Sequence, residues 1–245
     1  MDRWRGKVAL VTGASGGIGH SLAETLARNG MRVVACARRA EEIEKLQKQL
    51  PEGSNDLTAI KCDLVKEEDI LAMFKQIEQQ FGHVDVLVNN AGTAFLDPLS
   101  EGKTSEWQQM LDLNVLAVCI CTREALRLMK KDNIDDGHIV NINSTSGHAL
   151  GAPPPIRFFE GTKHMLTALT KALNAELRQQ KSQIRVTNLS PGLVTTPITE
   201  LHADTLPPIK ALESIDISHA LLYILGVPPH VNIRELIIAP TEQSW

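Results

Sequence analysis

The residues whose types and spacing best suit a chemical role lie in a glycine-rich stretch, TGASGGIG, at residues 12–19. The stretch follows an apolar run at 8–11 and leads into a helical pattern. In this context, glycines let the backbone approach a pyrophosphate at a helix N-terminus. A tight turn can also require glycine for conformational reasons alone, so the motif needs support from other positions. Its candidate nucleotide-binding residues are Gly13, Ser15, Gly17, Ile18 and Gly19.

Polar residues accompany the ends of two further strand-like runs. Asp63 comes directly after the run at 57–62, and the sequence NNAG at 89–92 follows the run at 84–88. Open α/β sheets bind ligands at the carboxyl ends of their strands, although Asn and Asp are also common in turns because they bond their own backbone. We therefore add to the candidate nucleotide site Asp63, Leu64, Asn90, Ala91 and Gly92.

The second strand-like run indicates which nucleotide is bound. It is followed by Arg38 and Arg39, with no acidic residue where a carboxylate would accept hydrogen bonds from the ribose hydroxyls of NAD. An arginine there can instead pair with a 2′-phosphate. The two arginines favour NADP over NAD. The alternative is that they form only a solvated entry to the next helix.

Alternating strand and helix patterns position these motifs. Apolar, β-branched runs predict strands at 8–11, 32–36, 57–62, 84–88, 138–142, 185–189 and 236–239, and helical patterns cover 18–29, 41–50, 67–81, 105–131, 157–180 and 217–225. Strands alternating with helices imply βαβ crossovers, and strands that are apolar at consecutive positions suit a sheet covered on both faces. The predicted fold class is α/β, a doubly wound Rossmann fold with a seven-stranded parallel sheet and helices on both faces. The least regular segment, 195–214, is expected to lie over the site.

Composition limits the architecture and the partners. A chain of 245 residues with 43% hydrophobic residues suits one large core, so a single domain over 1–245 is expected. The net charge of -4 gives no reason to expect nucleic acid or an anionic membrane surface. No apolar stretch approaches the roughly 20 residues that span a bilayer, and the polar N-terminus does not resemble a signal peptide, so the cytoplasm is the expected location. The four cysteines lack metal-binding spacing and are expected to be reduced core residues; no metal is predicted.

Together, these segments resemble the short-chain dehydrogenase/reductase family over essentially the whole chain. Besides the stretches at 12–19 and 89–92, the resemblance rests on Asn114, Asn143, Ser144, Lys163 and the sequence PGLVTT at 191–196. It implies that the helices at 105–131 and 157–180 form a homodimer or homotetramer. The further cofactor-binding residues that it implies are Lys163, Pro191, Gly192, Val194 and Thr196.

The same resemblance implies a set of catalytic positions. The family uses a Ser, a Tyr, a Lys four residues after that Tyr, and an Asn that holds a relay water. By this resemblance Ser144 orients the substrate oxygen, Lys163 binds the nicotinamide ribose and Asn114 holds the water. Counting back four residues from Lys163 gives Phe159 where the tyrosine is expected.

No tyrosine near Phe159 can take its place by a shift in register. Moving the alignment by one residue gives Phe158 or Glu160, and the only tyrosine of the chain, Tyr223, belongs to an apolar helical run expected in the core. Glu160 and two nearby histidines, His148 and His164, are expected to be structural or solvent-facing rather than catalytic.

The phenylalanine matters because carbonyl reduction needs a proton at the developing alkoxide, and a phenyl ring has none to give. Losing a general acid typically costs about 10²–10⁴-fold in rate. The sequence therefore leaves three interpretations open: an NADP-dependent dehydrogenase or reductase with impaired or altered chemistry, a non-redox isomerase, cyclase or lyase, and a catalytically inactive nucleotide-binding homologue.

The expected substrate wall is apolar. Phe95 and Leu96 follow the fourth strand-like run, and the segments 149–155 and 193–209 follow the fifth and sixth. Such a pocket suits a small hydrophobic carbonyl or alcohol, terpenoid-like or steroid-like. The alternative is that these residues are core residues beneath loops.

Overall fold

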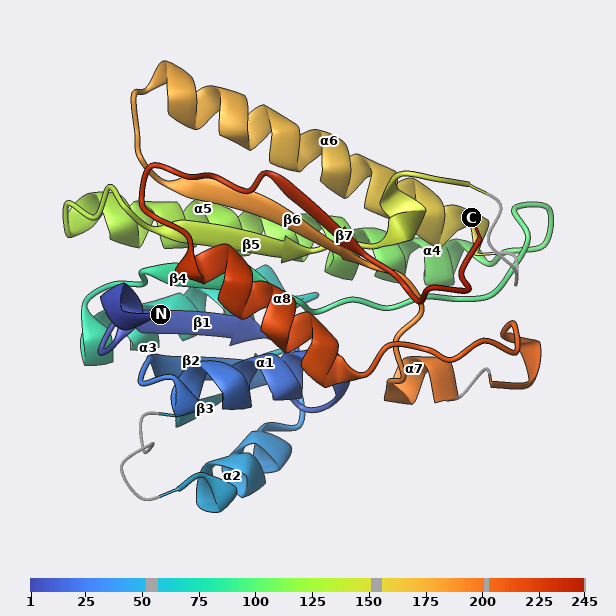
Figure 1. Cartoon of the computed structure of the whole chain (residues 1–245), viewed down its shortest axis with the longest axis horizontal. Helices are drawn as coiled ribbons and strands as arrows, with labels where there is room; N and C mark the ends of the chain where they lie inside the picture. Colours follow the sequence, from blue (N-terminus) through green and yellow to red (C-terminus); the bar gives the residue numbers. More distant parts are fainter. Residues whose placement is uncertain (52–56, 151–155, 201–202, 245) are drawn as a thin grey trace.

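The computed structural model describes residues 1–51, 57–150, 156–200 and 203–244 (Figure 1). Its centre is one seven-stranded parallel sheet in the order β3-β2-β1-β4-β5-β6-β7. This arrangement confirms the predicted doubly wound fold. The strands are β1 (Val8–Thr12), β2 (Arg32–Ala37), β3 (Leu57–Lys61), β4 (Val86–Asn89), β5 (His138–Ile142), β6 (Arg185–Pro191) and β7 (Glu235–Ile238).

Helices cover both faces of the sheet because alternate residues of each strand point to opposite sides. Ala9 and Val11 of β1 belong to one buried core, whereas Val8 and Leu10 belong to the other. The first core is closed by α1 (Gly17–Arg28), α2 (Ala40–Gln49) and α8 (Ser214–Gly226), and α1 packs directly on α8 (Figure 1). The second core is closed by α3 (Glu67–Phe81), α5 (Ala117–Lys131) and α6 (Arg157–Gln179).

The helix predicted at 105–131 is present, with one irregularity that the sequence pattern did not predict. The structure divides it into α4 (Thr104–Leu111), a π-helical turn (Asp112–Leu116) and α5. Asn114 lies in this turn, and its side chain bonds both backbone groups of Thr93. These bonds tie the turn to the loop after β4. The π-helical turn is only five residues long, too short to show an apolar periodicity of its own, so the sequence pattern did not reveal it.

Two expected core residues lie at the surface instead. Tyr223 is 62% exposed, because it occupies the outer side of α8 while Leu221, Ile224 and Leu225 face the sheet. Cys119 is exposed on α5, while Cys121 faces the core. In both helices the apolar run is longer than the buried stripe. Within the described residues, no helix is both long and apolar enough to cross a membrane, and no group of His, Cys, Asp and Glu could hold a metal ion.

Short helical turns, which the sequence patterns did not predict, shape the loops near the carboxyl ends of the strands. A 3-10 turn at Thr145–Gly147 follows β5, and α7 (Pro197–Glu200) and a 3-10 turn at Ala203–Thr205 follow β6. A further 3-10 turn at Asp2–Trp4 precedes β1 at the opposite edge. These turns are too short to show an apolar periodicity, so they escape prediction from sequence.

Candidate functional site

A cavity of about 680 Å³ runs along the carboxyl ends of the strands, from β3 to β6. Its lining includes all of the candidate nucleotide-binding residues predicted from the sequence, although these come from six separate loops and helices. They are Gly13, Ser15, Gly17, Ile18, Gly19, Arg38, Arg39, Asp63, Leu64, Asn90, Ala91, Gly92, Lys163, Pro191, Gly192, Val194 and Thr196. The volume is within the range of small-molecule pockets.

The glycine-rich turn forms the floor of the cavity between β1 and α1. Gly13 has φ +69°, and a Cβ there would stand 2.8 Å from the Cα of Ala91. A Cβ on Gly19 would overlap the Gly13 carbonyl and the Asn90 side chain. The turn after β1 therefore packs against the turn after β4 with no room for side chains.

Hydrogen bonds join the same two turns. The Asn90 amide donates to the carbonyl of Thr12 at 2.9 Å and to that of Gly13 at 3.2 Å. In return, the Thr12 hydroxyl accepts the backbone N–H of Asn90 at 2.9 Å and of Ala91 at 3.1 Å. Asn90 thus supports the floor of the cavity through its side chain, in addition to lining it.

Two arginines lie at the β2 end of the cavity. Arg38 and Arg39 line it together with Asp63 and Leu64, and with Ser15 they also enclose a smaller adjoining hollow. The Asp63 carboxylate accepts the backbone N–H of Val65 at 3.4 Å, as expected for an Asp in a turn. A guanidinium pair beside a small hollow can bind a phosphate.

Ser144, Phe159 and Lys163 meet at the other end of the cavity. Ser144 ends the extended segment after β5, and its hydroxyl accepts the Ser146 N–H at 3.1 Å. The Lys163 ammonium donates to the Ile142 carbonyl at 2.9 Å and lies 5.6 Å from the centre of the Phe159 ring. Burial, which disfavours the charged form, lowers the pKa of Lys163 to about 8.

Asn114 is buried beside this end but does not line the cavity. Its side-chain oxygen accepts the Thr93 N–H at 2.9 Å, and its amide donates to the Thr93 carbonyl at 2.9 Å and the Thr162 hydroxyl at 3.2 Å. The side chain therefore joins the loop after β4 to α6. It supports the site from behind rather than reaching into it.

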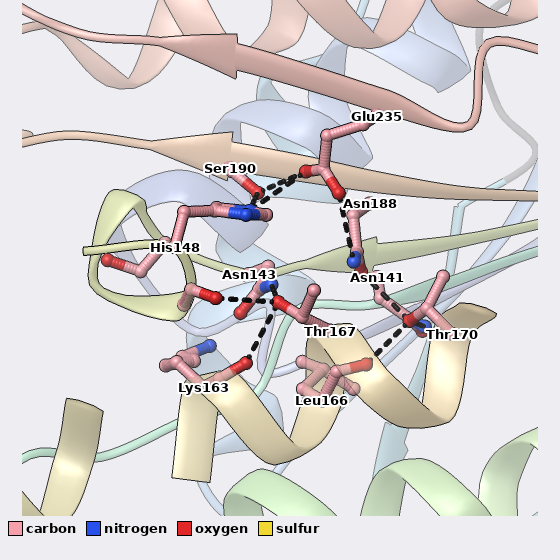
Figure 2. Close-up of polar contacts among 12 residues, drawn as sticks. Asn141, Asn143, His148, Lys163, Leu166, Thr167, Thr170, Asn188, Ser190 and Glu235 are labelled. Atoms are coloured by element: carbon pink, nitrogen blue, oxygen red, sulfur yellow. Dashed lines mark hydrogen bonds and ion pairs between the residues drawn. The ribbon is translucent and has the colours of Figure 1, made fainter. Parts of the chain in front are cut away.

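A partly buried polar network fixes the loop that carries Ser144 (Figure 2). His148 Nε2 lies 3.1 Å from the Ser190 hydroxyl and 3.2 Å from Glu235 Oε1, which accepts from Ser190 at 2.6 Å. Beside it, the Asn143 amide donates to the Thr167 hydroxyl at 2.7 Å. His148 contacts β6 and β7 rather than the cavity, which agrees with its expected structural role.

Other candidates near Phe159 are also structural. Glu160 is 0% exposed and pairs with Arg157 at 3.1 Å, while the His164 ring meets the Glu160 carbonyl at 2.9 Å. Neither lines the cavity. Phe158 stacks on Trp107 of α4, with ring centres 5.1 Å apart, and its side chain does not line the cavity.

The expected substrate wall is found in part. Leu96 lines the cavity but Phe95 does not, because the side chains of neighbouring residues in an extended loop point in different directions. The described part of 195–214 lies over the cavity as expected, contributing Thr196, Pro197, Thr199, Leu206, Pro207 and Ile209. The part of the expected wall at 151–155 lies outside the described residues. Sequence reasoning missed the C-terminal residues Glu242, Gln243 and Ser244, which also line the cavity and carry no motif of their own.

The doubly wound sheet, the glycine turn and the cavity at its carboxyl edge define a dinucleotide-binding domain of the Rossmann type. The sequence profile of the family described as short chain dehydrogenase matches residues 7–206, and the chain belongs to this family of oxidoreductases. The family expected from the motifs is therefore confirmed.

Individual relatives refine this placement. Dehydrogenase/reductase SDR family member 11 of Gallus gallus is 48% identical over 253 residues, covering 99% of each chain. Farnesol dehydrogenase of Aedes aegypti is 46% identical over 248 residues, covering 100% of each. Among solved structures, the closed form of serine dehydrogenase complexed with NADP+ has a TM-score of 0.88 at 29% identity, covering 97% of this chain and 96% of the other.

Proposed function

We propose that this chain is an NADP-dependent oxidoreductase acting on a hydrophobic carbonyl or alcohol, with chemistry altered by Phe159 in place of the family tyrosine. The observation that carries the proposal is one continuous cavity joining Arg38 and Arg39 at one end to Ser144 and Lys163 at the other. A dinucleotide has the length and chemistry to connect a phosphate-binding end to a reactive end.

The residues of the cavity fit an NADP molecule. Glycines at 13 and 19, where a side chain would collide with neighbouring backbone or side-chain atoms, let the turn after β1 lie close to the turn after β4, beside the N-terminus of α1. Arg38 and Arg39 would bind the 2′-phosphate. Lys163 would hold the nicotinamide ribose. When bound, NADPH supplies the hydride for carbonyl reduction. A solved metagenomic short-chain oxidoreductase in complex with NADP supports this choice, with a TM-score of 0.82, 29% identity and coverage of 98% of this chain and 99% of the other.

The chemical character of the far end supports a hydrophobic substrate. Beyond Ser144 and Lys163, aliphatic side chains dominate the wall, and they are Leu96, Leu113, Leu150, Ile156, Leu193, Leu206 and Ile209. A pocket of this type gains affinity from apolar burial and takes orientation from a few polar groups. A terpenoid or steroid of moderate size fits this chemistry, and the relative named farnesol dehydrogenase is consistent with it.

Phe159 determines how efficient the reaction can be. Ser144 can donate a hydrogen bond that orients a substrate oxygen, but the ring of Phe159 has no proton for a developing alkoxide. Lys163 lines this end of the cavity as a titratable group, and its lowered pKa makes its proton easier to release. Slow reduction, with the ammonium or water as proton source, is the expected activity.

The missing phenol also favours a second candidate function. A non-redox isomerase, cyclase or lyase reaction needs no proton at this position, and an inactive homologue would keep only nucleotide binding. Product analysis by mass spectrometry separates these cases. Carbonyl loss with equimolar NADPH oxidation supports the oxidoreductase, product without NADPH oxidation supports the non-redox enzyme, and binding without any product supports the inactive homologue.

Nucleotide titration tests the cofactor directly. Arg38→Ala combined with Arg39→Ala is expected to weaken NADPH binding by about tenfold to a hundredfold, because charge-assisted hydrogen bonds to phosphate are lost. NADH binding should be unchanged. Lys48→Ala, which removes an exposed cation from α2, is the control. Equal binding of NADPH and NADH to the wild-type chain would contradict the preference for NADP.

A homodimer or homotetramer is part of the proposal. The helices that the family resemblance assigns to subunit contacts, α5 with the preceding π-helical turn and α6, expose apolar side chains at Leu116 and Met165. Light scattering coupled to size-exclusion chromatography measures the mass of the assembly. A mass equal to that of a monomer at micromolar concentration would contradict the proposed homodimer or homotetramer.

A further inference from the structure

The C-terminal tail reaches back over the sheet edge and enters the cavity wall. After β7 the chain turns at Pro240, whose carbonyl accepts the Gln243 N–H at 3.0 Å, and this turn brings Glu242, Gln243 and Ser244 to the cavity. Of these, Gln243 makes side-chain hydrogen bonds to two different loops. The tail is therefore attached to the site at one side chain.

Gln243 connects the loop after β5 to the loop after β6. Its side-chain oxygen accepts the Leu193 N–H at 2.8 Å, and its amide donates to the Thr145 hydroxyl at 3.3 Å. Thr145 follows Ser144, and Leu193 follows the Pro191-Gly192 pair, so both bonds end within one or two residues of candidate site positions.

Gly192 is matched to this arrangement. A Cβ at Gly192 would overlap the Gln243 side-chain oxygen and stand 3.0 Å from Cδ of Pro240. The N–H of Gly192 also donates to the Ile238 carbonyl at 2.8 Å, which holds the loop after β6 against β7. The glycine thus makes room for the tail, and the tail in turn covers the glycine.

We propose that Gln243 is a positioning residue that holds the loops after β5 and β6 at a fixed separation, and so shapes the nicotinamide end of the cavity. The inference rests on the proposed NADP site. An amide suits this role because it accepts from a backbone N–H and donates to a hydroxyl at the same time. A carboxylate at 243 keeps the acceptor but loses the donor to Thr145.

The positions of these contacts predict that loss of the Gln243 side chain affects the binding of some nucleotides and not of others. Gln243 lies by the loops after β5 and β6, whereas Arg38 and Arg39 lie after β2, on the other side of β1 and β4 in the sheet order. Loosening the tail should weaken binding of a nucleotide that contains the nicotinamide half. It should leave a nucleotide that ends at the adenosine phosphates unaffected.

The experiment compares NADP+ with 2′,5′-ADP, which lacks the nicotinamide half, by isothermal titration calorimetry. Gln243→Ala is expected to weaken NADP+ binding by about fivefold to thirtyfold, the effect of one or two net hydrogen bonds. Binding of 2′,5′-ADP should change by less than about twofold. Gln47→Ala, an exposed glutamine on α2, is the matched control and should change neither affinity.

Two further variants test the hydrogen bonds themselves. Gln243→Glu retains the Leu193 contact, so it should bind NADP+ better than Gln243→Ala. Thr145→Val removes the hydroxyl that accepts from Gln243, and the double variant with Gln243→Ala should show less than additive loss. Thermal unfolding of each apo variant separates a local effect from general destabilisation.

The outcomes are distinguishable. If neither nucleotide binds to the wild-type chain, the proposed function fails. If NADP+ and 2′,5′-ADP both bind to the wild type, the nucleotide site stands. In that case the proposed role of Gln243 is overturned if Gln243→Ala weakens the binding of both nucleotides equally, or weakens the binding of neither. Fully additive losses in the double variant would overturn the Thr145 contact as its mechanism.

Discussion

Substituting Phe159 with tyrosine is expected to raise kcat/KM for carbonyl reduction by about 10²–10⁴-fold, the usual contribution of a general acid. At 1.36 kcal/mol for each factor of ten, this corresponds to roughly 3–5.5 kcal/mol of transition-state stabilisation. The ring of Phe159 lines the cavity with Ser144, so the added hydroxyl enters the cavity rather than the packed core. Little loss of stability is therefore expected from the substitution.

Lys163 gives this expectation its physical basis. Its ammonium lies 5.6 Å from the centre of the Phe159 ring, and burial lowers its pKa to about 8. A phenol on that ring would lie near a cation, which lowers the phenol pKa towards neutral and makes its proton easier to transfer. The gain should disappear in Lys163→Met on the Phe159→Tyr background.

The assay is NADPH oxidation with a panel of hydrophobic aldehydes and ketones, with product identified by mass spectrometry. Phe158→Tyr is the matched control, because Phe158 stacks on Trp107 instead of lining the cavity. It adds the same hydroxyl one residue away and should leave the rate unchanged. Intact NADPH binding with no rate increase in Phe159→Tyr would refute the assignment of position 159 to proton transfer.

Four further results are expected. Gly19→Ala should abolish nucleotide binding, because its Cβ would overlap Gly13 and Asn90, and nucleotide titration measures this. Gly161→Ala, at an exposed position of α6 with nothing within 4 Å of the added Cβ, should raise the free energy of unfolding by about 0.5–1 kcal/mol in chemical denaturation. The folded-state pKa of Lys163, about 8, lies below its ordinary value of 10.5, so between these two pH values the unfolded chain binds more protons than the folded chain. The free energy of unfolding should therefore rise with pH over this range, by on the order of 3 kcal/mol in urea melts. A Lys163→Met chain that shows the same rise would contradict this explanation. Thiol titration of the native chain should label Cys119 alone, because the other three cysteines are buried. Labelling should be slow, because partial desolvation of the Cys119 thiol raises its pKa, and labelling that persists in Cys119→Ser would show the buried cysteines to be accessible.

Much of this molecule was predictable because its signals are local. Each strand begins within two residues of its predicted start, since a run of apolar, β-branched residues identifies a buried strand without reference to the rest of the chain. The glycine turn and the residues after each strand were predictable for a related reason. Parallel connections bring the carboxyl ends of all strands to one edge, so residues far apart in sequence form one site.

Burial within helices was predicted less well. Tyr223 and Cys119 occur in apolar runs, yet they face outwards, because the direction of a helical side chain depends on how the helix is rotated against the sheet. The π-helical turn at Asp112–Leu116 also depends on tertiary contacts that the sequence pattern does not record. It is stabilised by contacts of Asn114 with Thr93, and such contacts form only after the loop and the helix have packed together.

The sequence by itself determined the fold class, the family and the set of residues at the sheet edge, because all of these follow from periodicity and from motifs at fixed spacing. It also determined that position 159 carries no hydroxyl. Only the tertiary structure decided that Asn114 stands behind the site, that Lys163 is buried enough to lower its pKa, and that Gln243 reaches the loops after β5 and β6. The physical reason is the same in each case, since burial and hydrogen bonds between distant residues depend on packing that no local pattern records.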